Sequence, residues 1–142
     1  MRKAVTVLIL ASNALLAQGK EPEAVLLGAS PEVSVYVYPA TVKVVGPGLV
    51  QAWSLYDMRS RQFENNVYLH SVKSLNVVDC RQQRIGILND IYYSERGGKG
   101  NVVWNGSVEM SAIKWQHVAP KSLSELKFDF ICDMEKAKRA RP

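Results

Sequence analysis

The chain has 142 residues, of which 47% are hydrophobic and 22% are charged, and its formal net charge at pH 7 is +5. These values are typical of one globular domain and exclude a chain that is mainly disordered. The surplus positive charge lies at the two ends, because residues 20–133 hold equal numbers of basic and acidic side chains. A nucleic-acid partner would need cations clustered on the folded surface, so we expect no nucleic-acid binding.

The first 19 residues have the pattern of a cleaved signal peptide. Two basic residues precede a largely apolar stretch at residues 4–17, and the run Ala-Gln-Gly that ends at Gly19 offers small residues to a signal peptidase. The apolar stretch is shorter than the roughly 20 residues of a membrane-spanning helix. We expect cleavage after Gly19 and export to the periplasm, the cell surface or the medium. No cysteine lies near this site, so we expect no lipid anchor on an N-terminal cysteine.

The predicted sheet begins after an N-terminal arm, residues 20–32, which holds two prolines and mixed polarity. Residues 33–38 are dense in β-branched and aromatic side chains and predict a strand, with a continuation past a bend expected at residues 41–45. The run Gly-Pro-Gly at residues 46–48 predicts a turn. Residues 49–58 alternate with apolar side chains on both faces, which predicts a strand covered on both sides.

The same alternation continues along the middle of the chain. A bulge or turn is expected at Lys73-Ser74, a flexible loop at residues 97–100 and a tight hairpin at Asn105-Gly106. The remaining predicted strands are residues 67–72, 75–80, 84–94 and 113–118.

After Pro120 the pattern changes to that of a helix. Ser122-Leu-Ser-Glu125 is a capping box, and a helix of about ten residues follows with one broad apolar face made of Leu123, Leu126, Phe130 and Cys132. We therefore predict an α+β fold, in which a curved antiparallel β-sheet of about six strands carries one C-terminal helix packed on it.

Two boundaries complete the predicted organisation of the chain. The folded domain is expected over residues 33–133, and residues 134–142 are expected to form a basic disordered tail. At most, this tail would make peripheral contact with anionic membrane lipids.

Cys80 and Cys132 are the only cysteines. In an exported chain an even number of cysteines predicts a disulfide, whereas a zinc site, the alternative, would need more closely paired ligands. The predicted bond tethers the C-terminal helix to the end of a central strand. Closing a loop of this size is worth roughly 4 kcal/mol in the chain-entropy model.

The sequence holds little catalytic chemistry. Its two histidines, His70 and His117, lie in predicted strands without a third metal donor, and the glycines at residues 97–100 lack the spacing of a phosphate-binding loop. We expect no enzyme activity, no cofactor and no metal.

A series of short motifs resembles one known family. The motifs, in order, are Trp53, Tyr56-Asp57, Asp79-Cys80, Tyr92-Tyr93-Ser94 with the glycines that follow, Trp115, Val118, Pro120-Lys121-Ser122 and Cys132. Over residues 50–132 this order and spacing resembles the surface-adhesin protein E family of small exported bacterial proteins. The resemblance implies an antiparallel sheet with a disulfide-held C-terminal helix, and binding to host matrix or serum proteins. The family's namesake is lipid-anchored, whereas this chain has no cysteine near its predicted cleavage site.

Two sets of residues are candidates for specific roles. Four cations at strand ends and turns, Arg81, Arg84, Arg96 and Lys99, are the candidate binding rim, and the alternative is ordinary solubilising charge. Trp53 and Trp115 are interpreted as structural anchors of the core.

The predicted function is that of a non-catalytic, exported protein-binding domain with a host matrix protein as partner. The alternative is a periplasmic structural or stress-related domain whose partner is an envelope component. If residues 33–38 or 113–118 form an uncovered sheet edge, two copies could also pair as a homodimer.

Overall fold

The computed structural model describes residues 22–141, which form one eight-stranded sheet and one long helix. The strands are ordered β1-β2-β4-β5-β6-β7, with β3 paired to β4 and β8 paired to β6, and all pairs are antiparallel. The strands are β1 (Val25–Ala29), β2 (Val33–Val37), β3 (Lys43–Gly46), β4 (Leu49–Glu64), β5 (Val67–Asp79), β6 (Arg84–Tyr93), β7 (Val102–Ser107) and β8 (Gln116–His117). The helix is α1 (Leu123–Arg139), and three short 3-10 helices cover Pro39–Thr41, Arg96–Gly98 and Met110–Ala112.

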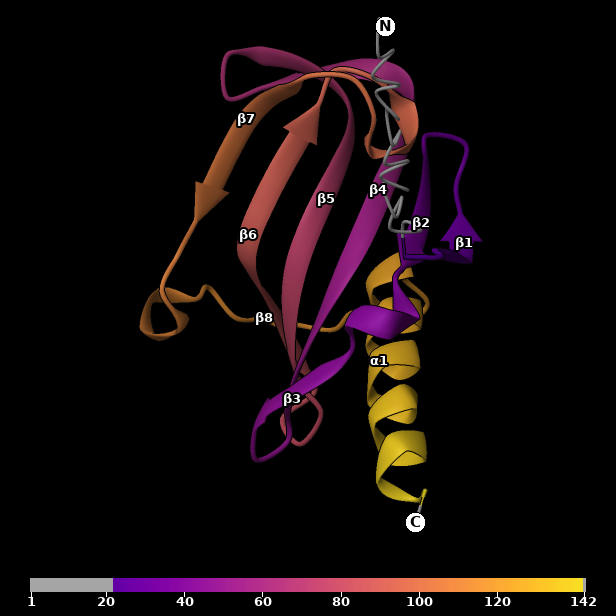
Figure 1. Cartoon of the computed structure of the whole chain (residues 1–142), viewed down its shortest axis with the longest axis vertical. Coiled ribbons are helices and arrows are strands. Elements are labelled where there is room, and N and C mark those ends of the chain that lie inside the picture. Colours follow the sequence, from indigo (N-terminus) through magenta and orange to yellow (C-terminus); the bar gives the residue numbers. More distant parts are fainter. Residues whose placement is uncertain (1–21, 142) are drawn as a thin grey trace, which may run out of the picture.

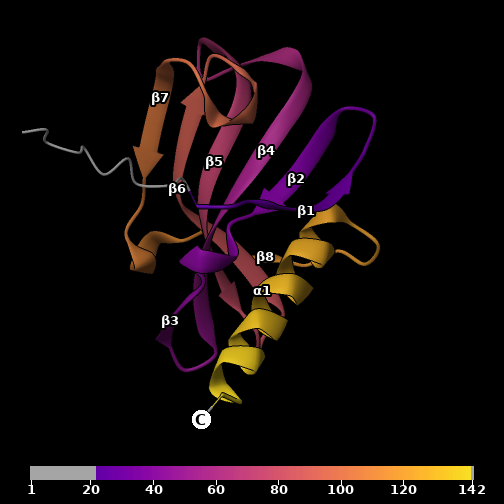
Figure 2. The same ribbon diagram turned by 45° about the vertical axis from the view of Figure 1, so that its right-hand side comes forward.

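The helix covers only one side of the curved sheet. It contacts β1, β4 and β5, and in both views of the molecule it lies on the side of β1 and β4, away from β7 (Figures 1 and 2). Strand β7 and the neighbouring end of β6 therefore lie beyond the part of the sheet that α1 covers.

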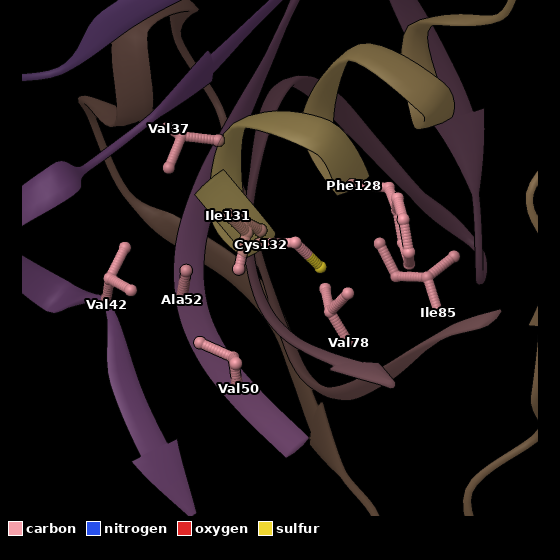
Figure 3. Close-up of a cluster of buried hydrophobic side chains, with 9 residues drawn as sticks. All are labelled: Val37, Val42, Val50, Ala52, Val78, Ile85, Phe128, Ile131 and Cys132. Carbon is pink, nitrogen blue, oxygen red and sulfur yellow. The ribbon is translucent and has the colours of Figure 1, made fainter. Parts of the chain in front are cut away.

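Alternation along the central strands builds the core beneath α1. Directly opposite residues in adjacent antiparallel strands point to the same face, which places Val50 of β4, Val78 of β5 and Ile85 of β6 in one row. Figure 3 shows this row facing Phe128 and Ile131 of the helix. The predicted fold class is confirmed.

The predicted disulfide is confirmed as well. Cys80 follows β5 and is joined to Cys132 of α1 by a bond of 2.06 Å, with the two Cα atoms 5.9 Å apart. Cys132 lies among the buried apolar side chains (Figure 3), so the bond holds the helix against the sheet at the centre of the core.

The strands differ from the prediction in several places, and β4 extends to Glu64, six residues beyond the predicted end. The expected arm contains β1, because its apolar run of residues 25–27 pairs with β2. Residues 67–79 form one strand without a break at Lys73-Ser74, since both residues pair with neighbours on each side. Asn105-Gly106 lies inside β7, and only two residues of the predicted strand 113–118 pair with β6.

The glycine of Asn105-Gly106 serves close packing, not a turn. A Cβ at Gly106 would lie 2.3 Å from Cη2 of Trp104, so the indole ring occupies the space above this residue. The tight hairpin turn between β4 and β5 is made instead by Asn65 and Asn66, whose φ angles are 49° and 61°, the left-handed values that asparagine tolerates best after glycine.

The helix begins as predicted and ends later. The side chain of Ser122 accepts a hydrogen bond of 3.1 Å from the Glu125 amide, as a capping box requires. The expected disordered tail is helical as far as Arg139, because its Glu, Lys, Ala and Arg residues favour helix and its cations suit a helix C-terminus. Lys138 donates a hydrogen bond of 2.6 Å to the Val42 carbonyl.

The buried face of α1 also differs from the predicted one. Leu126 is 46% exposed, and the buried residues are Lys127, Phe128, Ile131, Cys132 and Glu135. The disulfide turns Cys132 toward the sheet, and Phe128, four positions earlier, lies on the same side of the helix.

The main path of the sheet ends at β1 and β7, and the short strands β3 and β8 each pair on one side as well. Of the two expected edges, residues 33–38 are not an edge, because β2 lies between β1 and β4, whereas residues 116–117 form β8, which pairs with β6. In the described part of the chain, no helix combines the length and apolar character needed to cross a membrane. The predicted signal peptide lies outside the described residues.

Candidate functional site

The hairpin formed by β4 and β5 ends in an exposed aromatic pair. Phe63 and Tyr68 lie opposite each other, are 60% and 55% exposed, and have ring centroids 4.8 Å apart. The guanidinium of Arg61 lies 4.3 Å from the centroid of the Tyr68 ring. Aromatic and arginine side chains supply most of the strongest contacts in protein interfaces, so this tip has the composition of a protein-binding surface.

A loop at residues 94–100 is fixed at the same end of the sheet. The buried carboxylate of Asp57 accepts hydrogen bonds from Nη2 of Arg96 at 2.7 Å and from the Gly97 amide at 2.9 Å. Ser71 accepts a hydrogen bond of 2.8 Å from the Gly98 amide. The Asp57 hydrogen bond and charge raise the pKa of Arg96. We call the residues Arg61, Phe63 and Tyr68 together with loop 94–100 the hairpin end.

The four cations of the predicted rim do not lie together. Arg96 and exposed Lys99 belong to the hairpin end, whereas Arg81 and Arg84 lie at the turn between β5 and β6. The length of β6 separates the two pairs by about 30 Å. Arg84 is also engaged, since its Nε lies 3.1 Å from Asp79 Oδ2. No single surface presents all four side chains.

The two tryptophans interpreted as anchors are half-buried. Neither belongs to the two clusters of buried apolar side chains. The Trp53 amide donates to the Thr41 hydroxyl at 2.9 Å, and Trp115 stacks beneath the Arg84 guanidinium at 4.4 Å.

A polar network, absent from the sequence prediction, lies under the first turns of α1. Lys127 is only 2% exposed, and its ammonium donates to the Tyr56 hydroxyl and, at 2.8 Å, to Asn76 Oδ1. Asn76 in turn donates to the Ser54 hydroxyl at 2.7 Å. Nothing in the local pattern marks Lys127, which lies four residues before the buried Ile131 and therefore on the same face of the helix.

A row of polar residues crosses the same face of the sheet. Register places Ser54, Ser74, Asp90 and Gly106 directly opposite one another on β4 to β7. Ser74 donates a hydrogen bond of 2.5 Å to Asp90 Oδ1. This row separates the apolar core beneath α1 from a second buried cluster of Leu69, Val72 and Tyr92.

A cavity of about 490 Å³ lies beside this row of polar residues. We call it the helix-side cavity. Its polar lining includes Tyr56, Asn76, Asp90 and Lys127, and its apolar lining includes Ile85, Ile87 and Trp104. Ile87 is 44% exposed. A cavity of this size lies within the range of small-molecule sites.

Burial shifts the acid–base equilibria of this lining. It lowers the pKa of Lys127 to about 8, opposed by the negative charge of Asp90. Burial raises the pKa of Asp90, opposed by the hydrogen bond from Ser74. Burial and the charge of Asp90 raise the pKa of Tyr56 to about 12.

Comparison with known proteins identifies the family. The family model described as surface-adhesin protein E matches residues 25–133. This chain belongs to the surface-adhesin protein E family. A comparison with curated protein sequences found no match.

Solved structures of protein E from Haemophilus influenzae share the fold of this family member. One, from crystal form II, is 15% identical, covers 70% of this chain and 80% of its own, and superposes with a TM-score of 0.54. Another, from non-typeable Haemophilus influenzae, is also 15% identical, covers 82% of this chain and 79% of its own, and has a TM-score of 0.55. Membership in the surface-adhesin protein E family indicates an exported protein of the adhesin type.

Proposed function

We propose that this protein is an exported, non-catalytic domain that binds a host matrix or serum protein through its hairpin end. The exposed stack of Arg61, Phe63 and Tyr68 is the observation that carries the proposal. Large exposed aromatic side chains grouped together on a folded surface mark interaction sites. Family membership supports the adhesive role.

The rigidity of the hairpin end favours tight binding. Asp57 and Ser71 hold loop 94–100 through backbone hydrogen bonds, so this loop loses little freedom when a partner docks beside it. Less ordering on association leaves more of the contact energy as affinity. Of the predicted rim, Lys99 is the cation best placed to contact a partner here. We assign Arg96 the role of holding the loop.

Replacing Phe63 and Tyr68 together with serine is expected to weaken binding to the matrix or serum partner at least tenfold. Loss of one strong contact residue costs about 1.4 kcal/mol or more, which is a factor of ten. The measurement is surface plasmon resonance of the exported protein against a panel of purified matrix and serum proteins.

The matched control for this double variant is Val44→Ser. Val44 is also an exposed apolar residue, 46% accessible, but it lies on β3 at the opposite end of the sheet. The Val44→Ser variant should bind the partner as tightly as the unaltered protein. If the tip variant binds every partner as tightly as the unaltered protein, the hairpin end is not the binding surface.

The location of the exported protein decides between a host partner and an envelope partner. A protease added to intact cells would digest a surface protein and spare a periplasmic one. Protection from the protease would reject the host-protein proposal in favour of an envelope role.

Cleavage after Gly19 stays a prediction, as does a homodimer. The strands with a free side for pairing copies of the sheet include β1 and β7, at the two ends of the main path, and the short strands β3 and β8.

A further inference from the structure

We propose that the helix-side cavity binds a small zwitterion with an apolar body, of the type represented by free α-amino acids with branched or aromatic side chains. The site is separate from the hairpin end and does not depend on adhesion. It rests on two opposite charges, buried Lys127 and partly buried Asp90, on the apolar wall beside them and on the opening to solvent.

The two charges of the cavity are not paired with each other. Among residues 22–141, no ion pair within 4.0 Å involves Lys127 or Asp90. The Lys127 ammonium has three N–H groups and uses two of them, on Tyr56 and Asn76. Asp90 accepts from Ser74 through Oδ1, which leaves Oδ2 for a further donor. A ligand can therefore bond to both groups without displacing the network.

The opposite signs of the two groups select the charge of the ligand. A simple carboxylate would be attracted by Lys127 but repelled by Asp90. A simple amine would be attracted by Asp90 but repelled by Lys127. A zwitterion places its carboxylate at Lys127 and its ammonium at Asp90. Buried charges that gain a partner with hydrogen-bonding geometry no longer carry an uncompensated desolvation cost.

The rest of the cavity suits an apolar side chain. Ile87 leaves 44% of its surface uncovered although it lines a concavity. Trp104 presents its ring above Gly106, where a side chain on that residue would collide with the indole. Burying these two surfaces against a branched or aromatic group supplies the hydrophobic part of the affinity. Lys114 and Gln116, both exposed, also line the cavity and keep it polar toward solvent.

The test is isothermal titration calorimetry of the exported protein with a panel of free amino acids. The panel contains leucine, isoleucine, phenylalanine and tryptophan, with glycine as the member that lacks an apolar body. Two analogues of leucine remove one charge each: 4-methylpentanoate lacks the ammonium, and 3-methylbutylamine lacks the carboxylate. We expect at least one apolar amino acid to bind, and both analogues and glycine to bind at least tenfold more weakly.

Two variants assign the binding to the cavity. Asp90→Asn keeps the shape and removes the negative charge, and Lys127→Met keeps the length and removes the positive charge. Each should weaken binding at least tenfold, whereas Lys136→Met, on the exposed face of the same helix, should not. The indole N–H signal of Trp104, assigned by Trp104→Phe, should shift in the NMR spectrum when ligand is added.

Three results would overturn the proposal. No member of the panel binds at millimolar concentration, or an analogue with a single charge binds as tightly as leucine, or Asp90→Asn binds like the unaltered protein. Asp90→Asn decides the matter even if Lys127→Met does not fold, because Asp90 is only partly buried and an asparagine can still accept from Ser74.

Discussion

Replacing Cys132 with serine is expected to lower the free energy of unfolding by about 2–5 kcal/mol, the usual cost of losing a native disulfide in a small secreted domain. The bond closes a loop of 52 residues, so its loss restores much conformational freedom to the unfolded chain. It also releases α1, whose 17 residues would be only marginally helical alone. Chemical denaturation followed by circular dichroism measures the effect.

The control for this prediction lies on the same helix. Lys136 is 74% exposed and makes only a surface ion pair with Asp133, so Lys136→Ala should change stability by about 0.5 kcal/mol or less. Adding reductant to the unaltered protein should reproduce the loss seen in Cys132→Ser. An unchanged melting curve after reduction would show that the disulfide has no structural role.

Raising the pH from 8 to 10 is expected to stabilise the protein by about 2 kcal/mol through Lys127 alone. Burial lowers the pKa of this lysine from 10.5 to about 8 in the folded state. Between these two values the unfolded state binds more protons than the folded state, so stability rises with pH. Below pH 8 the folded protein carries the full cost of a buried ammonium.

The effect is isolated by comparing two lysine variants. Lys127→Met should remove the increase between pH 8 and 10, and Lys136→Met should retain it. The range ends at pH 10 because the pKa of Tyr56 is raised to about 12. The unfolded state loses this tyrosine proton first, so stability falls again at higher pH. An equal increase in both variants would show that Lys127 is not the group responsible.

The fold could be predicted from sequence where local chemistry decides the structure. The Ser122 side chain caps the helix by accepting from the Glu125 amide, and the Glu125 carboxylate accepts from the Lys121 amide just before it. The alternation of residues 49–58 marks a strand whatever its neighbours. Two cysteines in an exported chain leave one disulfide to form. The ordered motifs around Trp53, Tyr56 and Cys80 pointed to the family that the comparison confirms.

The same local reasoning was wrong where long-range packing overrides it. Asn105-Gly106 has the letters of a hairpin turn, but Gly106 is required because the Trp104 ring lies over it. The cations of the predicted rim share a residue type and a place near turns, yet β6 carries Arg84 at one end while Arg96 lies beyond the other. The length of β6 separates cations that had been grouped as one rim on the basis of their residue type.

The antiparallel sheet, the start of the closing helix and the pairing of the cysteines could be predicted from the sequence, because they depend on period, capping and the number of thiols. The buried face of the helix and the polar groups that meet beneath it depend instead on long-range packing. Lys127, Tyr56 and Asp90 come from a helix and two strands far apart in the chain. They meet because α1 packs Phe128 and Ile131 against the sheet beside the Cys80–Cys132 bond, and because strand register aligns Asp90 with Ser74. Lys127 and Asp90 have no local signal of this role, since each alone has the pattern of an ordinary surface residue.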